Sequence, residues 1–225
     1  MSRYGKILAA VVLAQMSSLS LDAQAQAARP AGISDDELFG TVIRNSKWES
    51  IPISVCWENP SRADARYRAI TRDAIEETWE RHSQVRFAGW GACANDSKGI
   101  RIRVADEGPH VQALGKYLDQ RPGGMVLNFT FSTWGVGTKC ESNRDFCVYA
   151  LAVHEFGHAL GFAHEQTHAD KPAECKADSA GPAGDYSVTK YDPASVMNYC
   201  NLNWVGDGKL SELDIEAVRK FYGSP

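Results

Sequence analysis

The sequence predicts an α+β fold with two unequal lobes. Segments with strand-like and helix-like patterns follow in the order strand, helix, strand, strand, strand, helix, and a last helix comes only after an irregular stretch. The chain has 225 residues, 44% of them hydrophobic, and a formal net charge of −4, which fits one globular domain with a sizeable core. Its 24 Lys and Arg residues are scattered, so the clustered basic face typical of nucleic-acid binding is not expected.

The first predicted elements are a strand and a long helix. Residues 51–58 (IPISVCWE) read as a strand with Pro52 near its start, and residues 61–84 read as an amphipathic helix with Ser61 as N-cap. The apolar stripe of this helix consists of Tyr67, Ile70, Ala74, Ile75 and Trp79. Three further strands are predicted at residues 85–90, 100–106 and 123–131.

The second half of the chain contains two predicted helices separated by an irregular part. Residues 148–161 (VYALAVHEFGHALG) are rich in Ala, Val and Leu and predict a buried helix, which would form the floor between the lobes. Residues 165–195 lack periodicity and are interrupted by Pro and Gly, as in a long functional loop. Residues 211–222 predict a final helix, with Ser211 as N-cap and Asp214 completing a capping box.

The N-terminal residues 1–27 have the pattern of a secretory signal peptide. Basic residues Arg3 and Lys6 precede the apolar run ILAAVVLA, and small residues follow, with cleavage expected after Ala25 or Ala27. The apolar run is much shorter than the roughly 20 residues of a membrane-spanning helix. A secreted or periplasmic protein is therefore predicted, with an uncleaved amphipathic tail as the alternative.

The remainder divides into an arm and one domain. Residues 28–50 are expected to form an N-terminal arm or a short leader, and residues 51–225 form the domain. Its upper lobe is expected at about 51–163 and its lower lobe at about 164–225. We expect little or no processing after signal cleavage, so that the mature chain starts near residues 26–28.

All six cysteines lie after the predicted signal peptide. An even number of cysteines in an exported protein indicates disulfides, here three, for which 15 pairings exist. A cysteine metal site is the alternative, but the chain has no C-x-x-C pair. We favour pairing between sequence neighbours, which gives Cys56–Cys93, Cys140–Cys147 and Cys175–Cys200.

Three of the six histidines fall within the stretch AVHEFGHALGFAHEQ at residues 152–166. In a helix, His154 and His158 are four residues apart and share one face, so both can bind the same metal ion. Glu155 is about 100° further round the helix, where it can reach a water molecule on that metal more easily than the metal itself. An ordinary helix with surface His and Glu is the alternative for this five-residue pattern alone.

His164 can join this pair only if the helix stops. A continued helix would carry His164 about 9 Å along the axis beyond His158, which is too far for zinc–nitrogen bonds of about 2.0–2.1 Å. Gly161 lies between them, and glycine commonly ends helices because it adopts positive φ at little steric cost. We therefore predict that the chain turns back at Gly161 and brings the third imidazole to the same ion.

Three neutral imidazoles with an open fourth position are typical of catalytic zinc, although nickel or copper can bind the same nitrogens. Zinc lowers the pKa of its bound water to about 7. Glu155 would accept a proton from this zinc-bound water as the water attacks a carbonyl, and would pass the proton to the leaving amine.

A second motif, YDPASVMNYC at residues 191–200, contains Met197. The pattern H-E-x-x-H-x-x-G-x-x-H followed by a methionine turn is the metzincin signature. The chain therefore resembles the metzincin clan of zinc endopeptidases, and HEFGHALGFAHE with SVMNY is most similar to the astacin family. Asn198 stands where that family has His, so matrixin-like bacterial relatives remain the alternative.

The resemblance implies a zincin domain. Its sheet would be twisted and mostly parallel with an antiparallel edge strand, and its helices would comprise a long backing helix, an active-site helix and the terminal helix of an irregular C-terminal lobe. It also implies that the strand at 123–131 offers a free edge to an extended peptide.

The resemblance assigns roles to individual residues. His154, His158 and His164 match the zinc ligands, and Glu155 matches the general base. Tyr199 matches a tyrosine that both ligates zinc and binds the transition-state oxyanion; a packed core tyrosine is the alternative. Other matches are the turn methionine, Met197, and the glutamate that pairs with a new N-terminus, Glu165.

These inferences predict a secreted zinc-dependent endopeptidase whose catalytic domain is residues 51–225. We expect one catalytic Zn²⁺, protein or peptide substrates, no nucleic-acid partner, no membrane anchor, and a monomer. A zinc amidase acting on cell-wall peptide cross-links and a non-catalytic peptide-binding domain of the same fold are the alternatives.

Overall fold

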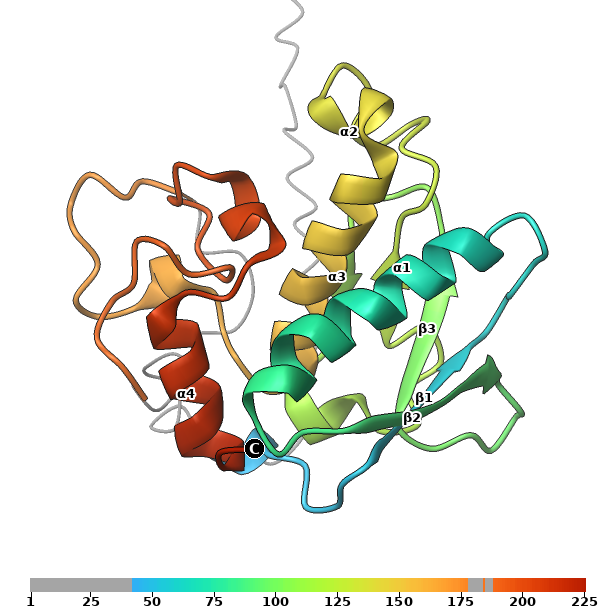
Figure 1. Ribbon diagram of the computed structural model, residues 1–225, viewed down its shortest axis with the longest axis horizontal. Coiled ribbons are helices and arrows are strands. Elements are labelled where there is room, and N and C mark those ends of the chain that lie inside the picture. Colours follow the sequence, from blue (N-terminus) through green and yellow to red (C-terminus); the bar gives the residue numbers. More distant parts are fainter. Residues whose placement is uncertain (1–41, 178–183, 185–187) are drawn as a thin grey trace, which may run out of the picture.

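The computed structural model describes residues 42–177, residue 184 and residues 188–225. A five-stranded sheet with the order β2-β1-β3-β5-β4 forms the upper lobe, and helices α1 and α3 lie side by side against it (Figure 1). All neighbouring strands are parallel except β4 and β5. The predicted α+β fold, a mostly parallel sheet with an antiparallel edge strand, is thus confirmed.

The strands are short, and four of the five, β1, β2, β3 and β5, overlap the predicted segments. Strand β3 keeps the alternation of its sequence, since Ile100 and Ile102 are fully buried and the residues between and after them are half-exposed. The bounds are β1 Ile53–Trp57, β2 Phe87–Ala92, β3 Ile100–Val104, β4 His110–Val111 and β5 Met125–Leu127.

The helices also lie where periodicity predicts them. The backing helix α1 (Ala65–Ile75) continues into a π-helical turn at Glu76–Glu80, and α3 (Arg144–Ala159) is almost wholly buried from Cys147 onward. The terminal helix α4 (Glu212–Tyr222) packs in the C-terminal lobe (Figure 1) and has the predicted capping box. The shorter pieces are α2 Lys139–Ser142 and the turns Arg44–Ser46, Gly115–Leu118, Glu165–Thr167 and Trp204–Gly208.

Three expectations are corrected. Regular helix begins at Ala65 with Asp64 as N-cap, because Ser61 and Asp64 exchange hydrogen bonds in a turn that precedes α1. The strand expected at 123–131 ends at Leu127, since the Asn128 side chain accepts hydrogen bonds from the backbone N–H groups of Thr130 and Phe131 and turns the chain.

The third correction concerns the free sheet edge. Strand β5 is paired on both sides, with β3 and with β4, so it has no free edge. The edge on this side of the sheet belongs to the two-residue strand β4, which no periodicity predicted. A strand this short carries too few residues to show alternation.

The three favoured disulfides are confirmed. Cys56–Cys93 joins β1 to the chain after β2, Cys140–Cys147 joins α2 to α3, and Cys175–Cys200 ties the irregular lobe to the methionine turn. No cysteine is free. Among the described residues, no helix is long and apolar enough to span a membrane.

Residues 42–48 of the predicted arm pack into the core at the C-terminal end of α3. Val42 bridges to Phe162 and Ile43 donates its N–H to the Gly161 carbonyl. The Trp48 indole N–H donates to the Ala159 carbonyl at 2.7 Å. This part of the arm therefore supports the segment that turns back after the helix.

Replacing Trp48 by alanine is expected to lower the free energy of unfolding by about 3–5 kcal/mol, because a large buried side chain is lost. Trp48→Phe should cost less, about 1–3 kcal/mol, because most of the buried ring is kept while the bond to the Ala159 carbonyl and the pyrrole part of the indole are lost. Chemical denaturation of the two variants measures both values, and equal stability of wild type and Trp48→Ala would contradict the packing role of the arm.

Candidate active site

Three buried histidines converge at the C-terminal end of α3. The Nε2 atom of His164 lies 3.2 Å from that of His154 and 3.1 Å from that of His158. They form the only group of three or more potential metal-ligating residues found in the described part of the chain. All three side chains are buried, with exposed fractions of at most 7%.

The return of His164 depends on the turn at Gly161. Helix α3 ends at Ala159, Gly161 has φ of 101°, and the N–H groups of Gly161 and Phe162 donate to the carbonyls of His158 and Gly157. This pair of bonds is the Schellman arrangement that ends many helices. The predicted reversal of the chain directly after the second histidine is therefore observed.

Backbone carbonyls orient two of the imidazoles. The Nδ1–H groups of His154 and His158 donate to the carbonyls of Val196 and Phe162, each at 2.7 Å. Burial, with the nearby His164, lowers the pKa of His154 to about 3 and that of His158 well below its ordinary value. Both rings are therefore neutral and turn the lone pair of Nε2 toward the centre of the cluster.

This donor set fits a zinc ion. Two nitrogens bound to one tetrahedral zinc at about 2.0–2.1 Å would stand roughly 3.3–3.4 Å apart, close to the observed separations. Lone pairs that face each other at this distance repel unless a cation lies between them. The residues present thus suit a divalent metal with nitrogen ligands.

Glu155 lies next to this cluster without a partner. Its side chain is 2% exposed, and Oε2 is the only buried side-chain oxygen or nitrogen of the described residues that lacks a hydrogen bond. Burial raises its pKa to about 8. A buried carboxylate oxygen is costly to leave unpaired, which marks a group that binds something else, such as a water molecule or a substrate atom.

Tyr199 covers the histidines on their solvent side. Its ring stacks on His154 at 5.4 Å and lies 4.4 Å from the ring of His164, while the residue stays 49% exposed. The Tyr199 backbone N–H donates to Gln166 Oε1. Partial burial and the charge of Glu155 raise the pKa of the Tyr199 phenol, so this group keeps its proton and remains a hydrogen-bond donor.

Met197 lies below the cluster, and Gly157 allows it to approach. A Cβ atom on Gly157 would stand 2.4 Å from Met197 Sδ and 3.1 Å from the Trp79 ring. Trp79, carried by the π-helical turn, also donates its indole N–H to the Val153 carbonyl. The sequence motifs assign Gly157 no role, although a glycine inside a buried helix is itself a sign of close approach.

Asp214 completes the predicted capping box of α4 and also supports the methionine turn. Its carboxylate accepts hydrogen bonds from Ser195 Oγ–H at 2.7 Å and from the Val196 N–H at 3.0 Å. The Val196 carbonyl in turn accepts from His154 Nδ1–H. Helix α4 is thereby connected through one residue to a histidine of the cluster, and burial raises the pKa of Asp214 to about 6.

Asp214→Ala is expected to weaken zinc binding about 10–100-fold. The Val196 N–H would lose its hydrogen bond to Asp214, and the Val196 carbonyl, which accepts from His154 Nδ1–H, would no longer be held in place. Competition with a chromogenic chelator measures the affinity. Glu212→Ala is the matched control, since Glu212 lies in the same first turn of α4 but is exposed. Equal affinities of the two variants would contradict a role for Asp214 in holding the site.

Glu165 is buried beside the cluster but faces the lower lobe. Its Oε1 accepts the N–H of Asp192 at 2.7 Å, and burial, with the neighbouring Asp214 and Asp192, raises its pKa to about 8. Its predicted partner, a new N-terminus, lies outside the described residues, as does the signal peptide. His168 is also buried, but its ring pairs with the Thr189 carbonyl and the Asp170 N–H, so it serves structure.

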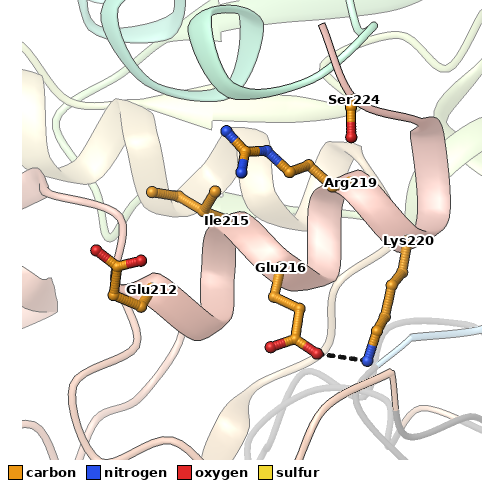
Figure 2. A pocket seen from close by; sticks show the side chains of 6 residues that line it. All are labelled: Glu212, Ile215, Glu216, Arg219, Lys220 and Ser224. Carbon is orange, nitrogen blue, oxygen red and sulfur yellow. Dashed lines mark ion pairs between the residues drawn. The ribbon is translucent and has the colours of Figure 1, made fainter.

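A surface groove along α4 lies away from these residues. Figure 2 shows its lining, in which Glu216 and Lys220 form an ion pair at 2.5 Å. Opposite charges neutralise one another along this face, and none of the predicted site residues contributes to it. The lining residues are Glu212, Ile215, Glu216, Arg219, Lys220 and Ser224.

Comparison with curated proteins finds zinc metalloproteinases. The chain is 36% identical over 69 residues to high choriolytic enzymes 1 and 2 of Oryzias latipes. It is 28% identical over 210 residues to zinc metalloproteinase nas-13 of Caenorhabditis elegans, which covers 83% of this chain. The matched regions span about a quarter of the choriolytic enzymes (26% and 25%) and 40% of nas-13. No family model matches.

Comparison with solved structures finds the same fold. Myroilysin superposes with a TM-score of 0.59 over 83% of this chain and 100% of its own, at 19% identity. High choriolytic enzyme 1 of Oryzias latipes, a hatching enzyme zinc-protease, gives 0.51 over 86% and 98%, also at 19% identity. At such identities these likenesses concern the fold.

Proposed function

We propose that this chain, a relative of the astacin-type zinc metalloproteinases, is a zinc-dependent endopeptidase that hydrolyses peptide bonds of proteins. The observation that carries this proposal is the convergence of three buried imidazoles beside a buried carboxylate oxygen without a partner. A zinc ion held by His154, His158 and His164 would polarise the scissile carbonyl and lower the pKa of water at the site.

Glu155 would carry out the proton transfers of the reaction. Glu155 accepts a proton from the attacking water and delivers it to the departing amine nitrogen. Burial, which raises the pKa of Glu155, favours this proton transfer, because a carboxyl group whose pKa is near neutral pH both accepts and releases a proton readily. The backbone acceptors of His154 and His158 hold these rings in one tautomer throughout.

Tyr199 would stabilise negative charge on the substrate. Its protonated phenol, at the solvent side of the histidine rings, can donate a hydrogen bond to the oxyanion that develops on the carbonyl oxygen. In the substrate-free enzyme the same oxygen would serve as a further metal ligand. The position of Tyr199, 49% exposed and in contact with the rings of His154 and His164, supports this exchange.

Strand β4 would bind the substrate backbone. It is the edge strand on the β5 side of the sheet and packs on α3, and an edge strand can pair with a peptide in extended conformation. Such pairing is independent of side chains, so it suits an enzyme that cuts within protein chains.

We further propose that the protein is exported and acts as a monomer through a catalytic domain at 51–225. The three disulfides support an oxidising compartment, where such bonds persist. Mass spectrometry of the secreted protein would test the predicted start near residues 26–28; a start at residue 45 or later would contradict it.

One experiment separates this function from the alternatives. Purified mature protein is assayed on casein and on cell walls, with and without a zinc chelator, beside Glu155→Ala. Casein cleavage that is lost in both controls is expected and supports an endopeptidase. Release of wall peptides alone would favour the amidase, and cleavage of neither substrate by zinc-loaded protein would favour a binding domain.

A further inference from the structure

Tyr199 carries a half-exposed ring on a backbone segment that is held on both sides. Its ring contacts the rings of His154 and His164, yet the residue is 49% exposed. The residues before and after it, Asn198 and Cys200, are held by hydrogen bonds and by a disulfide bond. The contacts of these two neighbours therefore decide how the ring can move.

Asn198, directly before Tyr199, uses both ends of its side-chain amide. Its Nδ2 donates to the Tyr191 hydroxyl oxygen at 2.9 Å and to the Asp192 carbonyl at 2.8 Å. Its Oδ1 accepts the N–H of Cys200 at 2.9 Å, and the residue is fully buried. A buried amide whose donor and acceptor are both bonded keeps one orientation, so the backbone before Tyr199 is fixed.

The disulfide Cys175–Cys200 fixes the backbone directly after Tyr199. On the other side of this bond, the buried half-cystine at position 175 donates its N–H to the Pro172 carbonyl at 3.0 Å. The chain before it is anchored by the buried ring of His168, whose two nitrogens both have backbone partners. The covalent bond therefore joins Tyr199 to a part of the chain that is itself held in place.

That part of the chain, residues 164–175, also begins with the third histidine, and we call it the histidine segment. The Glu165 N–H donates to the Met197 carbonyl at 2.9 Å, and the Tyr199 N–H donates to Gln166 Oε1 at 3.1 Å. Together with the disulfide, these bonds link the methionine turn to the histidine segment at three successive places.

The position of the Tyr199 phenol depends on these links, because they hold the backbone from which its side chain starts. A group that exchanges between a metal ion and a substrate oxygen has to return to the same place in every cycle. A misplacement of about 1 Å can lower a rate about 100-fold. A single hydrogen bond adds little net stability and opens readily, whereas a disulfide persists in an oxidising compartment. The disulfide is thus the link that restricts this backbone most.

We propose that the Cys175–Cys200 disulfide and Gln166 are positioning elements for Tyr199. They hold its backbone against the histidine segment, so that only the side chain rotates when the phenol exchanges between the metal and the oxyanion. This inference rests on the proposed function of Tyr199 and adds to it the residues that act through this tyrosine.

Cys175→Ala/Cys200→Ala, made with and without Tyr199→Phe, tests the coupling. In the chain that keeps Tyr199, loss of the disulfide should lower kcat on casein about 10-fold with little change of KM. Zinc affinity, measured by competition with a chromogenic chelator, should fall about 3–10-fold. In the Tyr199→Phe background the same loss should change neither value more than about 2-fold, because two changes that act through one group are not additive.

Cys56→Ala/Cys93→Ala is the matched control. This disulfide closes a loop of similar length, with a sequence separation of 37 compared with 25, and it lies at β1 and β2, away from β4 in the sheet. Both pairs of substitutions should lower the temperature of unfolding by similar amounts. The control should keep the kcat and the zinc affinity of wild type, and an equal loss of both in the control would overturn the proposal.

Gln166→Met provides a second test in which every disulfide is intact. Methionine keeps the length of this buried side chain but lacks the oxygen that accepts the Tyr199 N–H. It should lower kcat about 2–10-fold, again only in the chain that keeps Tyr199. The same losses in the Tyr199→Phe background, for this variant and for the disulfide variant, would overturn the positioning role and leave the endopeptidase and Tyr199 itself intact.

Two further outcomes are distinct from that one. If Tyr199→Phe alone kept the kcat and the zinc affinity of wild type, the role of Tyr199 and its positioning would both be overturned, while the endopeptidase would stand. No cleavage of casein by zinc-loaded wild type would instead overturn the proposed function and this inference with it.

Discussion

Glu155→Gln is expected to lower kcat on casein by about 10²–10⁴-fold, the range that a single general acid–base group supplies. Glutamine has nearly the same volume and keeps the buried site filled, but it can neither accept the proton of water nor return it to the amine. Initial rates at saturating substrate measure the effect.

Two controls make this result specific. Elemental analysis should find one zinc per chain in wild type and variant, because the three histidines and their backbone acceptors are unchanged. The temperature of unfolding should not fall, since glutamine keeps the size of the side chain and Oε2 of Glu155 has no hydrogen bond to lose. A zinc-loaded variant that retains more than about a tenth of the wild-type kcat would contradict the role of Glu155.

Gly161→Ala is expected to lower the free energy of unfolding by about 2–4 kcal/mol and to weaken zinc binding strongly. A side chain at φ of 101° is strained, and its Cβ would stand 2.3 Å from Oγ of the buried Ser46. Relief of this clash would shift the turn that places His164. Chemical denaturation and chelator competition measure the two effects.

Gly137→Ala is the matched control for this substitution. Gly137 also has positive φ, 75°, but no atom lies within 4 Å of an added Cβ. It should therefore cost only the backbone strain, about 1–3 kcal/mol, and leave zinc affinity unchanged. If Gly161→Ala bound zinc as tightly as Gly137→Ala does, the turn would not be what positions the third histidine.

The success of the sequence predictions has a local origin. His154 and His158 share a helix face because of the 3.6-residue period, and Gly161 ends the helix because of its own backbone freedom. The capping box of α4 depends on two side chains three residues apart. The three disulfides paired as sequence neighbours in an exported chain.

Tertiary structure alone decided the features that join distant segments. Strand β4 forms one edge of the sheet. Asp214 accepts a hydrogen bond from the N–H of Val196, whose carbonyl accepts from His154, and the missing Cβ of Gly157 leaves room for Met197. Residues 42–48 of the predicted arm also pack into the core beside the turn after α3.

The physical reason is the range of the interactions. The helix, the glycine turn and the cap arise between residues a few positions apart, so the amino-acid sequence by itself determined the histidine cluster and its nearby carboxylate. His158 finds its carbonyl partner four residues on, at Phe162, but the other supports of the site are a backbone carbonyl and a close van der Waals approach 40 or more residues away, as between His154 and Val196 (42) and between Gly157 and Met197 (40). Neither has a side-chain pattern that a sequence can display, and so only the folded chain decided which atoms support the site.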